Sequence, residues 1–197
     1  MCGRYLIDEN DAKMAEMANE AKKNLSLNVQ NPAFSADKIK TYGEIFPTDI
    51  VAVMTEKGSF AMKWGFVGYN GRIFINARCE TANALPTFKD SVNQRRCVIP
   101  ASAYFEWSKT KSGKVKHKIA AKENRLFLAA CYRYERTFKT DSFVILTTEA
   151  AENIKTIHGR MPLIIPENAL NNWFADEFSP ANWVSDIKLE LFPLTAG

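Results

Sequence analysis

Cys2 is the residue whose position most directly suggests chemistry. The chain begins Met-Cys-Gly-Arg-Tyr, and a small second residue allows removal of Met1, so we expect the mature chain to begin with Cys2. An N-terminal cysteine carries a thiol and an α-amine on adjacent carbons, and the reference pKa of that amine is near ~8. The neutral amine can form a Schiff base with an aldehyde, and the neighbouring thiol can then close a five-membered thiazolidine ring. Internal cysteines and lysines cannot form this ring.

Glu106 is a candidate for proton transfer. It stands between Phe105 and Trp107 in a predicted buried strand. A buried carboxylate is costly unless it is paired or functional. Glu106 is therefore either an acid-base group or one half of a salt bridge, to Arg78 for example.

His158 is a second candidate for acid-base chemistry, because an imidazole can gain or lose a proton near neutral pH. It lies between Ile157 and Gly159, beside Arg160. The other histidine, His117, follows a Ser-Gly turn in a lysine-rich segment, and we expect it to be a solvent-exposed hairpin residue. A structural role remains open for His158.

Polar side chains that could hold an anion lie near both ends of the first half of the chain. Arg4 offers a planar fork suited to phosphate. Strand alternation would place Asn76, Arg78 and Glu80 on one side of a predicted strand. Such a polar face could equally be a solvent-exposed surface.

Composition predicts one ordinary globular domain spanning residues 1–197. Hydrophobic residues make up 46% of the 197 residues and charged residues 24%, which argues against disorder. The four cysteines are far apart and form no C-x-x-C pair, so we expect neither a disulfide scaffold nor a metal site, and no cofactor. The net charge of +4 permits a polyanionic partner without requiring one.

No membrane segment is expected. The N-terminus lacks an apolar signal-peptide core, and no later stretch approaches the about 18 apolar residues of a membrane span. We therefore expect a cytoplasmic protein, in which the Cys2 thiol stays reduced.

The pattern of elements predicts an α+β fold in which strands dominate. An early helix is expected over residues 8–23. Short β-like segments with turn signals between them then follow: 50–54, 59–66, 72–75, 97–100, 103–107, 116–121, 126–134, 142–146 and 188–192. Short helices are expected over residues 82–94, 148–156 and 167–173. Many strands with few helices indicate curved or barrel-like, mainly antiparallel sheets with peripheral helices.

Six sequence blocks, in this order, resemble the SRAP family of abasic-site processing proteins, whose relatives include bacterial SOS-associated proteins. The resemblance spans nearly the whole chain. The blocks are Met1-Cys2-Gly3-Arg4-Tyr5, Trp64-Gly65-Phe66, Ile75-Asn76-Ala77-Arg78 with Glu80-Thr81, residues 96–100, Phe105-Glu106-Trp107, and residues 158–162.

The resemblance implies a β-rich SRAP fold and covalent capture of the ring-opened abasic sugar by Cys2 as a thiazolidine. By the same resemblance, Asn76 would orient the adduct and Glu106 would assist the proton transfers. His158 would protonate the sugar oxygen as the deoxyribose opens. Abasic-site lyase activity and N-terminal autoproteolysis are also implied.

The implied partner is single-stranded DNA that carries an abasic site, bound in a positively charged groove. Arg4, Arg78 and Arg160 would hold phosphates, and Trp64 and Trp107 would pack on bases or sugars. We expect a monomer that is nucleoid-associated when bound to DNA, with replication-fork proteins as further partners.

Two segments depart from the family pattern. Where many relatives have Asn-x-Ala-Pro, residues 42–49 read Tyr-Gly-Glu-Ile-Phe-Pro-Thr-Asp, so only Pro47 is carried over as a DNA contact. Gly159-Arg160-Met161 replaces a more charged turn, which would weaken phosphate binding there.

Two rival functions use the same residues differently. An N-terminal-nucleophile cysteine hydrolase would use the Cys2 thiol with its own α-amine as base and would leave no lasting DNA adduct. A non-covalent reader of modified DNA would need the arginines and tryptophans but not Cys2. The set of Asn76, Glu106 and His158 favours covalent capture over a simple reader.

Overall fold

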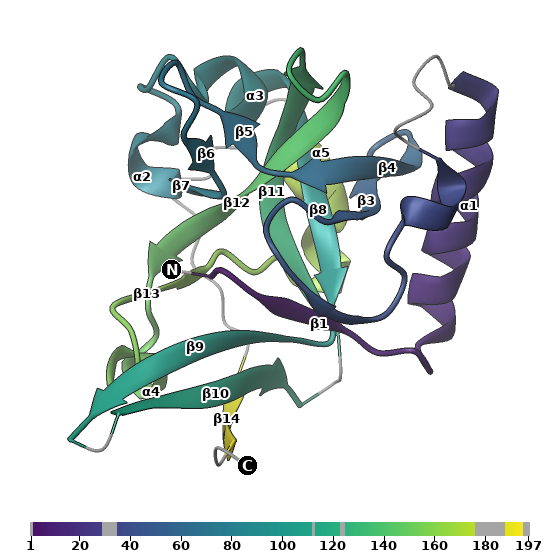
Figure 1. Ribbon diagram of the computed structural model, residues 1–197. Coiled ribbons are helices and arrows are strands. Elements are labelled where there is room, and N and C mark those ends of the chain that lie inside the picture. The colour runs from purple at the N-terminus through teal and green to yellow at the C-terminus, as the bar shows by residue number, and fades with distance from the viewer. Residues whose placement is uncertain (1, 29–34, 112, 123–124, 176–187, 195–197) are drawn as a thin grey trace.

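The computed structural model describes residues 2–28, 35–111, 113–122, 125–175 and 188–194. Within them the strands form sheets of five, seven and two strands, and the helices lie around these sheets (Figure 1). The predicted β-rich α+β fold with peripheral helices is confirmed.

Five strands of the larger sheet close into a barrel. In order around the barrel they are β11 (Leu126–Glu135), β8 (Arg96–Ala101), β3 (Ile50–Thr55), β4 (Gly58–Trp64) and β12 (Thr140–Glu149). β12 also pairs with β11, which completes the ring. Each of these pairings is antiparallel except that between β4 and β12. The predicted barrel-like, mainly antiparallel character is thereby confirmed.

Both faces of the barrel strands are buried, which explains their nearly continuous apolar sequences. In β8, Cys97 and Ile99 belong to the core cluster inside the barrel, whereas Val98 belongs to a second cluster outside it. The same alternation separates Phe143 from Val144 in β12. Strands buried on both faces lack the apolar-polar alternation of a half-exposed sheet.

The second sheet packs onto the barrel interior. Its strands, in spatial order, are β14 (Leu189–Leu194), β10 (Gly113–Ala121), β9 (Ala103–Thr110), β1 (Tyr5–Ile7) and β2 (Gly43–Ile45). Its buried residues Tyr5, Ile45, Tyr104 and Ile119 belong to the same core cluster as the barrel interior. A short hairpin of β5 (Phe66–Val67) and β6 (Ile73–Phe74) forms the third sheet.

Two strands extend the edges of β12 beyond the barrel. β7 (Asn76–Arg78) runs parallel to residues 145–147 of β12, and β13 (Arg160–Pro162) runs antiparallel to residues 147–149. β7 and β13 therefore both pair with the C-terminal end of β12, and the candidate site lies at this end.

The first helix, α1 (Ala12–Asn28), covers β3 and β4 through Met17, Ala18 and Ala21 (Figure 1). It begins four residues later than the predicted range of 8–23. The reason is that Asp11 caps the helix, its carboxylate accepting hydrogen bonds from the backbone N–H groups of Lys13 (3.0 Å) and Met14 (3.2 Å).

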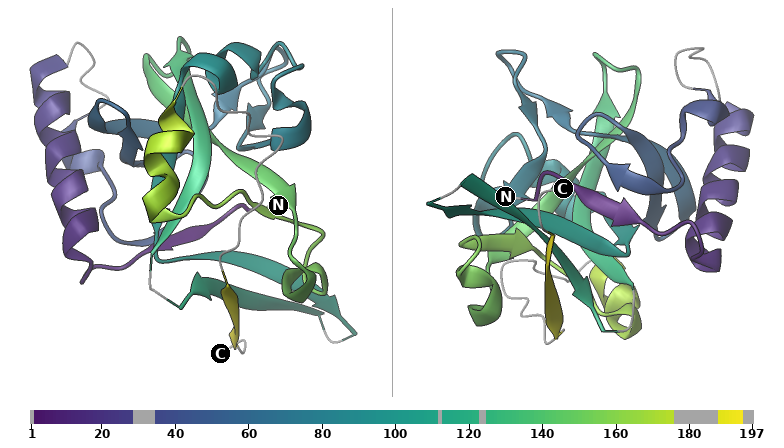
Figure 2. Two further views of the ribbon diagram at one scale, coloured as in Figure 1. Left: turned by 180° about the vertical axis from the view of Figure 1, so that it is seen from behind. Right: turned by 60° about the horizontal axis from the view of Figure 1, so that its bottom comes forward.

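The remaining helices are shorter than predicted. In place of one helix over 82–94, α2 (Cys79–Ala82) ends where that range begins and α3 (Lys89–Gln94) fills its last part, with Pro86 in the connection. In the range 148–156 the first two residues belong to β12, and α4 covers only Glu152–Lys155. The range 167–173 holds a 3-10 turn, Glu167–Ala169, followed by α5 (Leu170–Phe174), and another such turn spans Ala36–Lys38. Figure 2 shows α5 on the face of the barrel that is turned away in Figure 1.

Candidate active site

Cys2 lies three residues before β1 and is buried in the core. Figure 1 shows this end of the chain beside the ends of β12 and β13. Cys2 has 0% exposure, and the closest partner of its Sγ atom is the backbone oxygen of Arg4, at 3.8 Å. Burial, and secondarily the negative charge of Glu106, raises the pKa of the Cys2 thiol to about 12. In this closed arrangement the sulfur therefore rests as a thiol and not as a thiolate.

Asn76 is brought to Cys2 by the pairing of β7 with β12. Its side-chain Nδ2 donates a hydrogen bond of 2.9 Å to the backbone oxygen of Cys2. Its Oδ1 atom is buried and accepts no hydrogen bond from the described residues. The neighbouring Ala77 faces the core while Arg78 is exposed, as strand alternation predicted. Glu80, which was expected on the same strand, lies in α2 instead.

Glu106 points into the core from β9 and is 4% exposed. Its charge contributes to raising the pKa of Cys2, which places the carboxylate within electrostatic range of the thiol. Trp107, on the opposite side of the strand, is only half-buried. A salt bridge of Glu106 to Arg78 is not what balances this carboxylate, because Arg78 forms no ion pair with any described residue.

His158 lies in the turn that leads from α4 into β13. Its Nδ1 accepts a hydrogen bond of 3.0 Å from the backbone N–H of Arg160. The same Nδ1 also lies 3.1 Å from the backbone oxygen of Arg160. Both contacts hold the imidazole against the backbone at the start of β13.

The three arginines that the resemblance links to phosphate differ in their surroundings. Arg78 is exposed and has no ion-pair partner in the described part of the chain. Arg160 forms two hydrogen bonds to the carboxylate of Glu80, at 2.8 and 2.9 Å. Arg4 pairs with Glu44 at 3.3 Å. Arg78 is thus the one of the three whose guanidinium can meet a phosphate without first leaving a carboxylate.

The two tryptophans that the resemblance links to DNA also differ in their burial. Trp64 has 0% exposure, stacks on Phe143 and donates a hydrogen bond of 2.9 Å to the backbone oxygen of Ile75. Direct contact with a base or sugar does not fit this burial, so the prediction for Trp64 is corrected to a packing role. The following Gly65 has a φ of 128°, as expected for a bend beside a core aromatic.

Trp107 is half-buried and belongs to a cluster of aromatic rings and cations at the surface. The guanidinium of Arg4 lies 4.2 Å from the ring centroid of Phe46 and 5.1 Å from that of Trp107. Lys116 approaches the Trp107 ring at 5.9 Å and forms an ion pair with Glu44. Trp107 is therefore placed where a base could reach it, beside two cations.

Pro47 lies in a tight turn next to this cluster. The turn is closed by the backbone N–H of Asp49 bonding to the oxygen of Phe46 at 3.0 Å, and Thr48 in the turn has a φ of 75°. The neighbouring Phe46 is 39% exposed and contacts both Arg4 and Lys40. Phe46 was not predicted as a site residue, although it belongs to the segment 42–49 that departs from the family's Asn-x-Ala-Pro pattern.

His117 is not the solvent-exposed residue that the sequence predicted. It is half-buried in β10 and lies directly opposite Glu106 in the register of β9 and β10. Its Nε2 is 2.8 Å from the hydroxyl oxygen of Ser108. The position of His117 opposite Glu106 follows from the pairing of β9 with β10 and could not be predicted from the local sequence.

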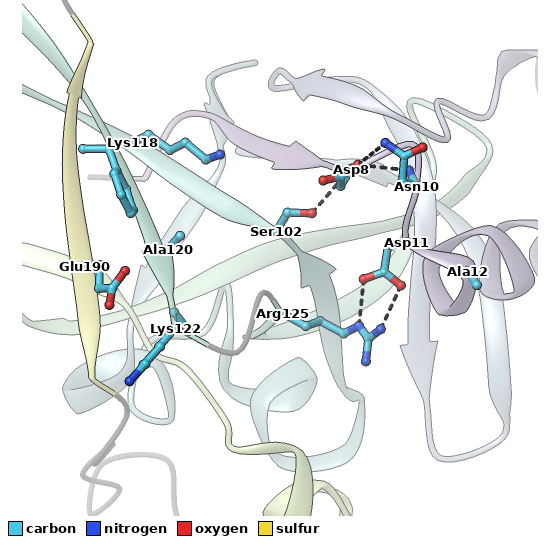
Figure 3. A pocket seen from close by; sticks show the side chains of 12 residues that line it. Asp8, Asn10, Asp11, Ala12, Ser102, Lys118, Ala120, Lys122, Arg125 and Glu190 are labelled. Carbon is cyan, nitrogen blue, oxygen red and sulfur yellow. Dashed lines mark hydrogen bonds and ion pairs between the residues drawn. The ribbon is translucent and has the colours of Figure 1, made fainter.

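A cavity of about 530 Å³ lies elsewhere, between the start of α1, β10 and β14 (Figure 3). Its walls carry both signs of charge, including Asp8, Lys118 and Glu190, and Asp11 pairs with Arg125 at its edge. None of the predicted site residues lines this cavity.

The described residues include no group of three metal-ligating side chains that could hold a metal ion, and all four cysteines are free and buried. In the same part of the chain, no helix has the length and apolar character needed to cross a membrane.

Comparison with known proteins gives one consistent result. The family model described as SOS response associated peptidase (SRAP) matches residues 1–192. Similar proteins include "Abasic site processing protein YoaM" of Bacillus subtilis, 27% identical over 79% of this chain and 78% of its own length. "Abasic site processing protein YedK" of Escherichia coli is 25% identical over 91% of this chain and 82% of its own length.

The fold is also found among solved structures. A crystal structure of a protein from Bacteroides thetaiotaomicron superimposes with a TM-score of 0.75 at 16% identity, covering 98% of this chain and 92% of that one. With the family model matching almost the whole length, the chain belongs to the SOS response associated peptidase (SRAP) family.

Proposed function

We propose that this protein captures abasic sites in single-stranded DNA by forming a thiazolidine between Cys2 and the ring-opened sugar. The observation that carries the proposal is the convergence of three groups from distant parts of the chain. Asn76 holds the Cys2 backbone at 2.9 Å, and the buried Glu106 acts electrostatically on the Cys2 thiol. The names of the relatives, which describe abasic-site processing, support the same substrate.

The first step opens the sugar. An abasic site is mostly a closed hemiacetal, and the aldehyde is the minor, ring-opened form. His158 is proposed to protonate the ring oxygen through Nε2, while water takes the proton of the hydroxyl on C1′ and returns a proton to the imidazole. The contacts of Nδ1 with the Arg160 backbone support this role by holding the ring in place.

The second step forms the Schiff base. The α-amine of Cys2, present once Met1 has been removed, adds to C1′ and gives a carbinolamine. Loss of water from the carbinolamine then gives the imine. Glu106 is proposed to deliver the proton that leaves with the hydroxyl group and to receive the proton released by nitrogen.

The third step closes the ring. The Cys2 sulfur bonds to the imine carbon, and the thiol proton ends on the nitrogen, so the complete adduct differs from its reactants by one water. Because burial raises the pKa of the Cys2 thiol to about 12, this proton must be removed during the reaction. Glu106, whose charge acts on the thiol, is the proposed relay for it.

DNA binding is proposed to be single-stranded, independent of sequence and sensitive to salt. The sugar must reach a buried chain terminus, which an intact duplex would prevent unless it opened locally. Arg78 is the proposed principal phosphate contact, with Trp107 as the stacking surface. N-terminal autoproteolysis and abasic-site lyase activity are further activities that we assign to the same Cys2-centred site.

The proposal is tested by the requirement for an aldehyde. Mature protein is incubated with single-stranded oligonucleotides that carry either an abasic site or its tetrahydrofuran analogue, which lacks the aldehyde, and is analysed on a denaturing gel. We expect a covalent band only with the abasic site, and less of it when the complementary strand is annealed. Equal bands with both oligonucleotides, or none with either, would contradict the proposal.

A further inference from the structure

Two tyrosine hydroxyls that have no hydrogen-bond partner among the described residues belong to residues of the same buried core cluster as Cys2. Tyr5 and Tyr104 are both 0% exposed, and neither hydroxyl oxygen has a partner among the described residues. They face each other in the register of β1 and β9, so both side chains project to the same side of the sheet. A buried hydroxyl without a partner costs about 1–3 kcal/mol, which is difficult to explain by packing because phenylalanine would fill the same space.

The surroundings show which atom these hydroxyls can serve. Burial raises the pKa of Tyr5, and the charge of Cys2 is the next cause. Burial also raises the pKa of Tyr104, followed by the charges of Cys2 and Glu106. Both phenols therefore lie within electrostatic range of the Cys2 sulfur. Strand alternation also places Tyr104 on the same side of β9 as Glu106.

The Cys2 sulfur needs hydrogen-bond donors during the reaction. Its hydrogen bond to the backbone oxygen of Arg4 is long, 3.8 Å, and uses the thiol proton. Once the proton is removed, the sulfur becomes a buried anion, which is strongly disfavoured without donors. Asn76 directs its amide to the Cys2 oxygen, and Glu106 is the proposed acceptor of the thiol proton, so neither is assigned to this task.

We propose that the Tyr5 and Tyr104 hydroxyls donate hydrogen bonds to the Cys2 sulfur as it closes the thiazolidine ring. The inference rests on the proposed function and adds two catalytic residues to it. In this step the sulfur bonds to the imine carbon, the carbon-nitrogen double bond becomes single, and the thiol proton is transferred to nitrogen. The phenols keep their own protons and only stabilise negative charge on sulfur.

The test separates imine formation from ring closure. Mature wild-type, Tyr5→Phe, Tyr104→Phe and double-variant proteins are mixed with a single-stranded abasic oligonucleotide and pulsed with borohydride at successive times. Reduction adds hydrogen to the imine but not to the thiazolidine, so intact mass distinguishes the two adducts. Tyr132→Phe is the matched control, because Tyr132 lies on β11 and the charges that act on it are those of other residues.

We expect imine formation at the wild-type rate and ring closure slowed about tenfold by each loss of a hydroxyl, equivalent to about 1.4 kcal/mol. The reducible imine then accumulates in the variants but not in Tyr132→Phe. Thermal stability should be unchanged or raised, because an unpartnered buried hydroxyl is removed.

Ring closure at the wild-type rate in the double variant would overturn the proposal for the tyrosines and leave covalent capture intact. A lowered melting temperature with no accumulation of imine would assign the hydroxyls a structural role and would also overturn it. Failure of the wild-type protein to form any adduct would instead refute the proposed function, on which the tyrosine proposal depends.

Discussion

Replacement of Asn76 by alanine should slow adduct formation, because Asn76 holds the backbone of the reacting residue. The 2.9 Å hydrogen bond from its Nδ2 fixes the Cys2 carbonyl. Without it the carbonyl loses its partner, and the amine and thiol of Cys2 can rotate away from the position in which both reach C1′.

The size of the effect follows from the burial of the contact. A net hydrogen bond contributes about 0.5–1.5 kcal/mol, and a buried group left without a partner costs about 1–3 kcal/mol. A loss of about 1–3 kcal/mol in the transition state corresponds to adduct formation about 5- to 150-fold slower. Asn76→Asp should be slower still, since a carboxylate would face the Cys2 oxygen with no proton to donate.

The assay is the rate of covalent band formation with a single-stranded abasic oligonucleotide under conditions of excess protein. Asn24→Ala is the matched control, because Asn24 in α1 also donates a 2.9 Å hydrogen bond from its Nδ2 to a backbone oxygen, that of Ser59. Both variants should lose similar stability, but only Asn76→Ala should react slowly. Equal reaction rates in the two variants would refute a positioning role for Asn76.

Three further results are expected. Glu106→Gln keeps the size of the side chain but removes its ability to relay a proton, so adduct formation should slow by about 100-fold. Affinity for the unreactive tetrahydrofuran oligonucleotide should be unchanged. A normal rate of adduct formation would remove Glu106 from the mechanism. Arg78→Gln should weaken binding of that oligonucleotide and reduce the slope of log affinity against log salt by about 1. Arg160→Gln should change this slope less, because Arg160 is already paired with Glu80. A larger change of slope in Arg160→Gln than in Arg78→Gln would contradict the assignment of Arg78 as the principal phosphate contact. Asp11→Ala should destabilise the protein by about 1 kcal/mol through loss of the helix cap. The hydrogen bond from Arg125 is the main cause that lowers the pKa of Asp11 in the folded state. The stability that Asp11 contributes is therefore present above its unfolded pKa and is lost as pH falls through the lower folded pKa. Thermal melts of wild type and variant should converge in acid.

The barrel was predictable because its strands are local apolar runs separated by turn signals. β8, β11 and β12 are largely buried on both faces, and each contains a short run of apolar residues bounded by polar or turn residues. The short strands β1, β2 and β13 were not predicted. Three-residue segments carry almost no periodicity, and their conformation is set by the strands on which they pair.

The sequence predicted residues for the candidate site but not their environment. Cys2, Asn76 and Glu106 came from position and resemblance, and the contact of Asn76 with Cys2 is consistent with their assignment to one site. The burial of Trp64, the ion pair of Arg160 and the register that places His117 opposite Glu106 depend on tertiary packing. No local pattern in one sequence could supply them.

The pKa of the Cys2 thiol illustrates the same difference. The sequence alone suggested a free and reactive thiol, whereas burial in the core raises its pKa to about 12. Reactivity must therefore come from the groups that surround the sulfur and not from an intrinsically acidic thiol. Glu106 and the hydroxyls of Tyr5 and Tyr104 are the groups proposed to activate the sulfur.

The most direct test of the account is the intact mass of mature protein after incubation with a single-stranded oligonucleotide carrying one abasic site, beside Cys2→Ala treated identically. Removal of Met1 is confirmed in both preparations by the mass of the free protein. The account predicts a stable species equal to protein plus oligonucleotide minus one water in the wild type, and none in Cys2→Ala. An adduct of the same yield in Cys2→Ala, or none in processed wild-type protein, would contradict covalent capture by Cys2.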